Sequence, residues 1–205
     1  MASDTTATSV LDFWLADGLT PTPGWPSKDM KQLWFTGGPE VDQQISRQFG
    51  AQVALALAGG LKDWEPEPLS RLALVILLDQ FTRNIFRGNA NAFSGDARAQ
   101  QLVSDALAQG VDEQLSWVGR VFMYMPLMHA EHLALQEESV RRFTRLARAV
   151  PETLRDRINS NLGFATQHRD IIARFGRFPY RNAALGRTSS ALEFDFLKIG
   201  PRFGQ

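Results

Sequence analysis

The chain has 205 residues, and a chain of this length can bury about 70% of its unfolded surface in one domain without a disulfide or a structural metal. Its 22 Lys+Arg balance 22 Asp+Glu, and this neutrality disfavours nucleic acid as a partner. Because the chain has no cysteine, disulfides, thiolate catalysis, cysteine-ligated zinc and iron–sulfur clusters are excluded, and His, Asp and Glu are left as the plausible metal ligands. We expect neither a cofactor nor a metal.

The N-terminal segment predicts no targeting signal. Residues 1–9 are small and polar and lack the positive start and the apolar stretch of a signal peptide. We therefore expect residues 1–8 to be disordered and the protein to be soluble and cytoplasmic. Ser9 then caps a short predicted helix that ends at Asp17-Gly18.

Apolar periodicity predicts helices through the rest of the chain. One helix begins at Gly38-Pro39-Glu40 and ends at Gly59-Gly60. The next opens at Pro66 and Pro68 and is apolar on every side from Leu72 to Leu78, which places it at the centre of the fold. This longest apolar run is too short to cross a bilayer. Further helices are expected over about 94–109, 113–124 with a break near Pro126, 129–149, 152–175 and 190–198.

The fold class follows from this pattern. No segment alternates with a period of two, so the prediction is an all-α single domain of about eight or nine helices in antiparallel hairpins. A strict tetratricopeptide consensus is not visible at its 34-residue period. The sequence leaves the oligomeric state open.

The first polar cluster lies where the buried helix turns polar. Asp79, Arg83 and Arg87 follow one another at i, i+4 and i+8, so the acid precedes its bases on one helix face. One interpretation is an ion-pair network that ties loops to the core, because a buried unpaired charge is costly. The other is a pocket floor in which an arginine holds an anion that Asp79 orients.

The second cluster contains two of the three histidines. His129 and His132 are placed on one helix face at i, i+3, with Glu131 between them, and imidazole offers a base near neutral pH. The spacing matches no zinc-protease motif, so a hydrogen-bonded histidine is preferred to a metal ligand. His168 falls on an apolar helix face and is interpreted as a core residue.

The third cluster is rich in arginine and aromatic residues. Residues 140–205 hold 13 Lys+Arg against 5 Asp+Glu, and Arg177, Arg181 and Arg187 alternate with rings between 174 and 187, where no acid occurs. These side chains could grip phosphates while rings stack on a ligand. Equally, they could anchor a loop through backbone carbonyls and through carboxylates such as Asp79.

Five blocks of residues follow one another along the chain: Val10-Leu11-Asp12-Phe13-Trp14, Trp34-Phe35, Leu78-Asp79-Gln80-Phe81 with Arg83-Asn84, Tyr124-Met125-Pro126-Leu127-Met128-His129 with Glu131 and Gln136, and His168 to Asn182 with Leu185-Gly186-Arg187. Together they resemble a bacterial family catalogued as domain of unknown function 924. The resemblance covers nearly the whole chain and is specific as a set. It implies a tetratricopeptide-like all-helical fold and brings no established activity.

Departures from the family pattern direct attention to particular residues. The resemblance implies proline at Thr82, serine at Ala130, an acid at His132 and histidine at Tyr180. Since His132 and Tyr180 then look exchangeable, neither is expected to be an obligatory ligand or catalyst. The residues that stay under suspicion are Asp79, Arg83, His129, Glu131, His168, Arg177 and Arg181.

Three functions are compatible with these clusters. The preferred one is a non-catalytic binding protein with a polar pocket or groove for an anionic small ligand or a peptide, held by Arg83, Arg87, His168, Arg177 and Arg181. The second is an enzyme in which His129 acts as acid or base while Asp79 and Arg177 or Arg181 clamp a carboxylate or a phosphate. The third is RNA binding through the arginine-rich C-terminal third.

Overall fold

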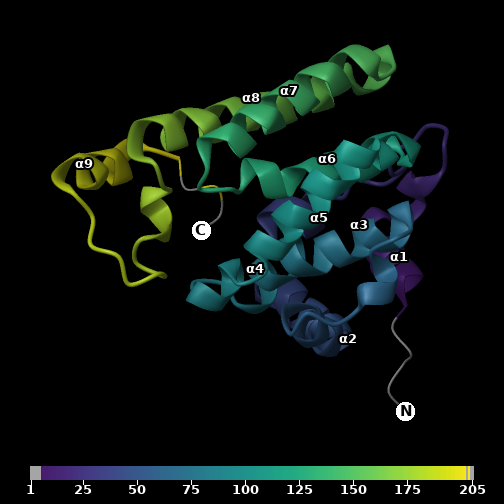
Figure 1. The fold of residues 1–205 in the computed structure, drawn as a ribbon, viewed down its shortest axis with the longest axis horizontal. Coiled ribbons are helices and arrows are strands. Elements are labelled where there is room, and N and C mark those ends of the chain that lie inside the picture. The colour runs from purple at the N-terminus through teal and green to yellow at the C-terminus, as the bar shows by residue number, and fades with distance from the viewer. Residues whose placement is uncertain (1–5, 202, 204–205) are drawn as a thin grey trace. The chain divides into compact units, whose positions relative to one another are not determined.

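The computed structural model describes residues 6–201 and 203, and within these it contains nine α-helices and no strand (Figure 1). The predicted all-α class is confirmed. None of the described helices combines the length and the apolar character needed to cross a membrane. The helices are α1 (Ala7–Leu15), α2 (Pro39–Leu57), α3 (Pro68–Ile76), α4 (Thr82–Ile85), α5 (Asp96–Gln109), α6 (Trp117–Met128), α7 (Leu133–Ala149), α8 (Glu152–Phe175) and α9 (Ala191–Ile199).

The chain divides into two compact units. The first comprises the chain up to Phe86 together with Asn91–Pro126, and the second comprises Arg87–Ala90 and the chain from Leu127 onward. Whether they form the single domain expected from the sequence stays a prediction.

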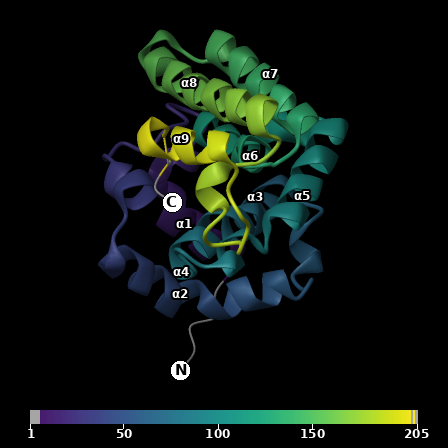
Figure 2. The ribbon, with the colours of Figure 1, turned by 90° about the vertical axis from the view of Figure 1, so that its left-hand side faces the viewer.

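The first unit is built around α3. Every side chain from Leu72 to Leu78 is fully buried, as the all-round apolar pattern predicts. The rings of Trp14, Phe49 and Phe81 pack edge-on or tilted in the same core. In both ribbon views α2 runs alongside α4 at the edge of this unit (Figures 1 and 2).

The second unit is built on a long helical hairpin. Helices α7 and α8 lie side by side and antiparallel (Figure 1), joined by a turn at Val150 and Pro151. Helix α8 has the predicted bounds, and it is followed by Gly176, whose φ of +69° suits glycine better than any other residue. Beyond it, Phe196 of α9 packs its ring on Phe175.

The N-terminal predictions need correction. Helix α1 begins at Ala7, and its cap is Thr6, whose hydroxyl accepts from the Ser9 N–H while the Ser9 hydroxyl returns a bond to Thr6. Ser9 is therefore the third residue of a capping box and not the cap. The disorder predicted for residues 1–8 is wrong for Thr6, Ala7 and Thr8, and residues 1–5 lie outside the described part.

The region around Pro126 was also predicted wrongly. Pro126 lies inside α6, which continues to Met128, and α7 begins at Leu133 instead of His129. The side-chain amide of Gln136 explains the break, because it donates to the carbonyls of Met128 (2.6 Å) and Ala130 (2.7 Å). These carbonyls thus find partners after the helix ends.

Candidate functional site

The predicted site residues fall into both units of the chain. Asp79 and Arg83 belong to the first unit, whereas the other candidates belong to the second. Arg87 is exposed and follows α4, which ends at Ile85, so it does not extend the helical ladder of Asp79 and Arg83. The second-unit candidates are Arg87, His129, Glu131, His168, Arg177 and Arg181.

In the first unit, Arg83 lies between two carboxylates. Its guanidinium is 3.2 Å from Asp79 Oδ1 and 2.9 Å from Asp96 Oδ1, and a second nitrogen donates to Asp96 Oδ2 at 3.1 Å. Asp79 is 1% exposed and also accepts from the Gln80 side chain. All three charges are largely withdrawn from water, so the arrangement is the ion-pair network that the sequence offered as one interpretation.

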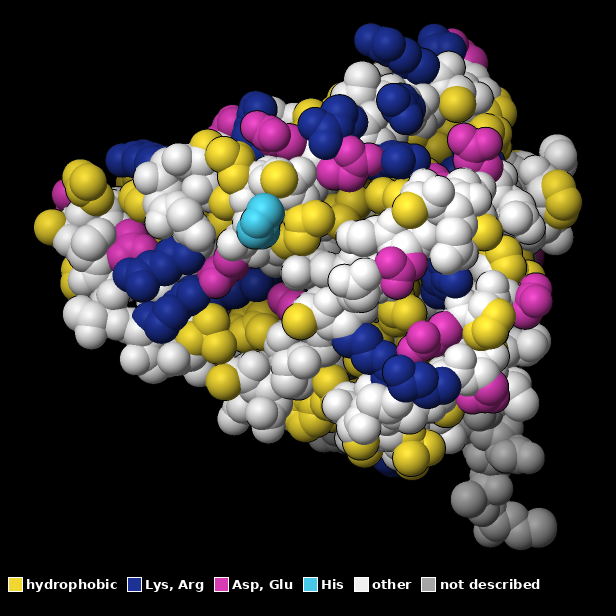
Figure 3. Space-filling view, in the orientation of Figure 1, with side chains coloured by type: hydrophobic (Ala, Val, Ile, Leu, Met, Phe, Trp, Pro, Cys, Tyr) yellow, Lys and Arg dark blue, Asp and Glu magenta, His cyan; other side chains and the backbone are white. Residues whose placement is uncertain are grey.

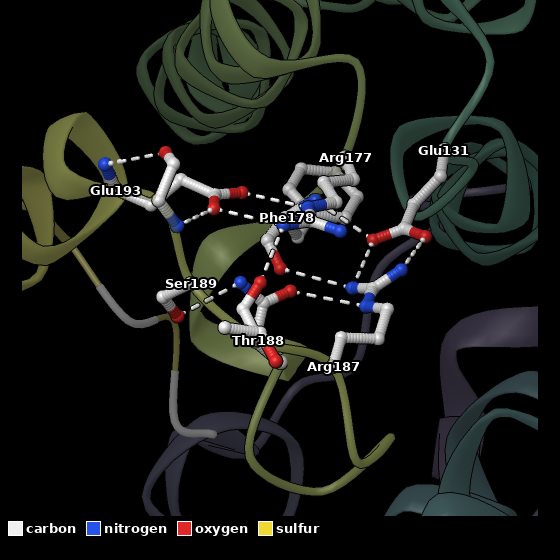
Figure 4. A network of polar contacts seen from close by, with 9 residues as sticks. Glu131, Arg177, Phe178, Arg187, Thr188, Ser189 and Glu193 are labelled. Atoms are coloured by element: carbon white, nitrogen blue, oxygen red, sulfur yellow. Dashed lines mark hydrogen bonds and ion pairs between the residues drawn. The ribbon is translucent and has the colours of Figure 1, made fainter.

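In the second unit, Glu131 and Arg187 form a bidentate pair. Arg187 donates to both carboxylate oxygens at 2.7 and 2.9 Å, and the Phe178 N–H donates to the same carboxylate at 2.7 Å (Figure 4). Burial by itself would raise the pKa of Glu131. The hydrogen bonds from Arg187 and Phe178 and the positive charges of Arg187 and Arg181 outweigh it, so the pKa lies below its ordinary value.

A second bidentate pair joins Arg177 to Glu193. Arg177 Nε and Nη2 donate to the two carboxylate oxygens at 2.7 and 2.8 Å, and Nη2 also donates to the Thr188 carbonyl (Figure 4). Glu193 is buried at the start of α9, where its carboxylate accepts from the Ser190 N–H in the predicted capping box. The pKa of Glu193 is lowered to about 2, chiefly by Arg177, against the opposing effect of burial.

We call Glu131, Arg177, Arg187 and Glu193 the Arg–Glu network. Its residues come from the turn before α7, from the segment after α8 and from α9, and Figure 4 shows them converging on Phe178 and Thr188. Arg187 further donates to Asn182 Oδ1 at 3.0 Å, and Asn182 donates to the Ser189 hydroxyl at 3.0 Å. The network therefore fixes the conformation of residues 177–189.

His168 lies in an aromatic cluster of the same unit. It is 3% exposed, its Nδ1 bonds to the Phe164 carbonyl at 2.8 Å, and its ring centroid is 3.9 Å from that of Phe203 and 5.4 Å from that of Phe178. Its predicted place in the core is confirmed. The half-buried His129 has its ring 6.1 Å from His168, but it lies in a turn, so the predicted helical face shared with the exposed His132 is wrong.

Arg181 is the third arginine near this network. Its guanidinium is buried and lies over the Phe178 ring, 4.6 Å from the centroid. The Tyr180 ring stacks on the Phe178 ring, with 5.2 Å between the two ring centroids. With Arg181 included, three arginines face the two carboxylates of the Arg–Glu network. The local balance of charge is therefore positive.

A hollow of about 410 Å³ opens beside the Arg–Glu network. One wall is the 3₁₀ turn Pro179–Arg181 and the segment that follows it, and the other wall is α9. The lining combines four apolar side chains with a phenol, two hydroxyls and one guanidinium. The lining residues are Pro179, Tyr180, Ala183, Arg187, Thr188, Ser189, Phe194 and Leu197.

Comparison with known proteins places the chain in a family. Residues 10–200 match the family described as "Bacterial protein of unknown function (DUF924)". The chain belongs to the DUF924 family. A solved structure, the protein of unknown function ATU0120 from Agrobacterium tumefaciens, is 33% identical in sequence; the match covers 95% of this chain and 97% of that one, with a TM-score of 0.77. No curated protein matches the chain.

Two residues that complete the polar clusters of this DUF924 protein are not among those predicted from the sequence. Asp96 is the second carboxylate on Arg83, and Glu193 is the partner of Arg177. Both lie at a helix start, where an acid is ordinary and gives no sign of its partner. The only available signal was the absence of acids between 174 and 187, which implied that the arginines there need distant carboxylates.

The arrangement of the described residues can be compared with three predicted kinds of site in the DUF924 protein: a metal site, an enzyme active site and an anion-binding site. Among the described residues, no three His, Asp or Glu side chains are grouped to hold a metal ion. The predicted enzyme needs Asp79 from one unit and His129 from the other, and it stays a prediction. Arg83 and Arg177, both predicted to bind an anion, each have carboxylate partners within the protein.

Proposed function

We propose that this DUF924 protein is a helical binding protein whose hollow beside α9 accepts a short peptide segment. The observation that carries the proposal is the lining of this hollow, in which the large ring of Phe194 is 58% exposed beside Leu197 and the hydroxyl of Ser189. A volume of about 410 Å³ suits one or two side chains with their backbone.

The charges of the lining favour a peptide over a small free anion. Arg187 is the one guanidinium in the lining, and Glu131 already holds two of its donor nitrogens. A free carboxylate or phosphate would have to compete with Glu131 for Arg187. A peptide instead needs an apolar surface and neutral hydrogen-bonding groups, which Phe194 and Thr188 provide.

The Arg–Glu network supports this proposal by holding the hollow in shape. Both bidentate pairs act on the walls: Glu131 and Arg187 fix the segment after Phe178, and Arg177 and Glu193 fix the start of α9. Because the wall is ordered before binding, the binding free energy does not include the entropy cost of ordering the wall. The helical hairpin of α7 and α8 is also compatible with the tetratricopeptide-like assignment, which we retain as part of the proposal.

The test is a screen of short peptides by protein-observed NMR. We expect a subset that contains a large apolar residue to shift resonances of α9 and of residues 179–189. Phe194→Ala should weaken this binding about tenfold, because it removes most of the exposed apolar wall. The matched control is Leu192→Ala, since Leu192 is on the same helix and 64% exposed but does not line the hollow.

Either of two results would reject the proposal. In the first, no peptide shifts these resonances in the parent protein. In the second, Phe194→Ala and Leu192→Ala weaken binding equally, which would place the peptide on the outer face of α9 instead of in the hollow. Phe194 is exposed, so both variants are expected to fold, and circular dichroism would confirm this.

A further inference from the structure

A second hollow, of about 420 Å³, lies on the surface of the α7–α8 hairpin. Each helix contributes an arginine and a polar residue one turn away: Arg148 and Thr144 from α7, and Arg155 and Asn159 from α8. Ala147 and Leu162 complete the lining, which contains no acid. This hollow shares no lining residue with the one proposed to bind a peptide.

The two arginines of this hollow come from its two different helices. Arg148 is in the last turn of α7 and Arg155 in the first turns of α8, and the turn at Pro151 brings these two helix ends together. Each guanidinium presents parallel N–H donors to a ligand placed between them. A doubly charged group with several acceptor oxygens is the complementary shape.

The guanidinium groups of Arg148 and Arg155 can bind a ligand without giving up a buried ion pair. Arg83, Arg177 and Arg187 are each held by carboxylates of the protein. Within residues 6–201 and 203, Arg148 makes no ion pair or hydrogen bond, and it is exposed. Arg155 pairs only with Glu152 among the described residues, and Glu152 is 77% exposed. An exposed pair of this kind contributes little free energy, so a ligand can displace it.

The surroundings strengthen the positive potential at this hollow. Arg141 and Arg145 lie along the exposed side of α7 toward Arg148, and Figure 3 shows dark blue side chains over α7 and α8 with magenta ones interspersed. Only Glu138 offsets Arg141, and Arg145 has no partner among the described residues. The exposed cations along α7 therefore add to the positive potential near Arg148.

We propose that the α7–α8 hollow binds the phosphate group of a small phosphorylated molecule, with Arg148 and Arg155 holding the phosphate from two sides. The exposed amide of Asn159 can hydrogen-bond the bound molecule, and the apolar side chains of Ala147 and Leu162 receive its organic part. The hollow exceeds the size of a bare phosphate ion, which is why the proposal names a phosphorylated organic molecule.

The test uses the full chain in isothermal titration with three probes: pyrophosphate, adenosine monophosphate and a ten-nucleotide single-stranded RNA. We expect pyrophosphate and adenosine monophosphate to bind, and the affinity to fall as salt rises. Arg148→Ala and Arg155→Ala should each weaken binding about tenfold, the usual effect of losing one charge-assisted hydrogen-bonding group. The double variant should weaken it further.

Arg174→Ala is the matched control, because it removes one positive charge from α8, the helix that carries Arg155. Arg174 is exposed, does not line the hollow, and lies 19 residues after Arg155, which is roughly 28 Å along α8. Its substitution should leave the affinity unchanged. The proposal is overturned if neither small probe binds at millimolar concentration, or if Arg174→Ala weakens binding as much as Arg148→Ala.

The RNA arm separates the proposed site from a diffuse basic surface. Binding of RNA alone, weakened equally by Arg148→Ala and Arg174→Ala, would contradict the proposal and point to nonspecific attraction along the hairpin. Binding of adenosine monophosphate that competes with pyrophosphate supports it. Because the peptide hollow has a separate lining, Phe194→Ala should not change phosphate binding, so either proposal can fail alone.

Discussion

Single residues in this protein owe their charge state to partners far away in sequence. Glu193 is the clearest case: it lies in the first turn of α9, it is buried, and Arg177 lies 16 residues before it. A buried carboxylate without a partner would hold a proton more tightly than in water. The bidentate pair with Arg177 reverses this, so Glu193 remains charged well below neutral pH.

Acid should therefore destabilise the protein through Glu193. Its pKa is about 2 in the folded chain and near 4.5 when unfolded, so its contribution to the free energy of unfolding is present above about pH 4.5 and is lost as the pH falls toward 2. Glu193→Gln should lower the free energy of unfolding by about 2 kcal/mol at pH 7 and flatten its dependence on pH below 4.5.

Thermal or urea unfolding from pH 7 to pH 2.5 measures this effect. Asp195→Asn is the control, because Asp195 is an exposed carboxylate of the same helix that pairs only locally with Lys198. The control should keep the parent's pH dependence. If Glu193→Gln also keeps it, the Arg177 pair does not contribute to stability in the way its geometry indicates.

At the scale of elements, the segment between α3 and α4 combines a change of helix type with a buried charge. Residues Leu77–Phe81 form a π-helical stretch, and the hydroxyl of Thr82 donates to the Leu78 carbonyl at 2.8 Å. Gly95, before α5, approaches the same carbonyl so closely that an added Cβ would lie 2.3 Å from the oxygen. This close packing places Asp96 next to Arg83.

Loss of Arg83 should be much more harmful than loss of one of its carboxylates. Arg83→Met leaves Asp79 and Asp96 without their shared cation in a largely buried place, and it should lower the free energy of unfolding by about 3–5 kcal/mol. Asp96→Asn keeps the pair of Arg83 with Asp79 and should cost about 1 kcal/mol. Urea denaturation of both variants compares them directly, and equal losses would contradict the idea that Arg83 neutralises two charges at once.

Elements of this protein were predicted well where local chemistry sets their ends. Proline at the start of α2, glycine after α8 and the Ser190 capping box of α9 each act within one turn, so the sequence shows them. The end of α6 depends instead on the side chain of Gln136, eight residues after the Met128 carbonyl it bonds. Local signals do not reveal that contact, and Pro126, the local signal that predicts a break, lies inside the helix.

The polar clusters show the same division between local and distant contacts. The Asp79–Arg83 pair is four residues apart and followed from helical spacing. Glu131 and Arg187 are 56 residues apart, and nothing local indicated that these two would pair. The arginine-rich segment was expected to need carboxylates, but the ones it uses, Glu131 and Glu193, were not those suggested.

For the whole molecule, burial predicts which parts open first. Every side chain from Leu72 in α3 to Leu78 is buried, whereas Leu192, Phe194 and Ile199 of α9 are exposed. Backbone amides exchange with solvent at a rate set by the free energy of the opening that exposes them. We therefore expect the amides of α3 to exchange slowest and those of α9 to be among the fastest helical amides.

Hydrogen exchange measured by mass spectrometry tests this order, and one substitution connects it to the Arg–Glu network. Arg177→Met removes the partner of Glu193 and should speed exchange in α9 and in residues 177–189 by about tenfold or more, because the buried carboxylate at the start of α9 then opposes the closed form. Exchange in α3, which belongs to the first unit, should not change. If α3 and α9 instead accelerate together, the two units open as one cooperative body, and the network stabilises the entire chain instead of the walls of one hollow.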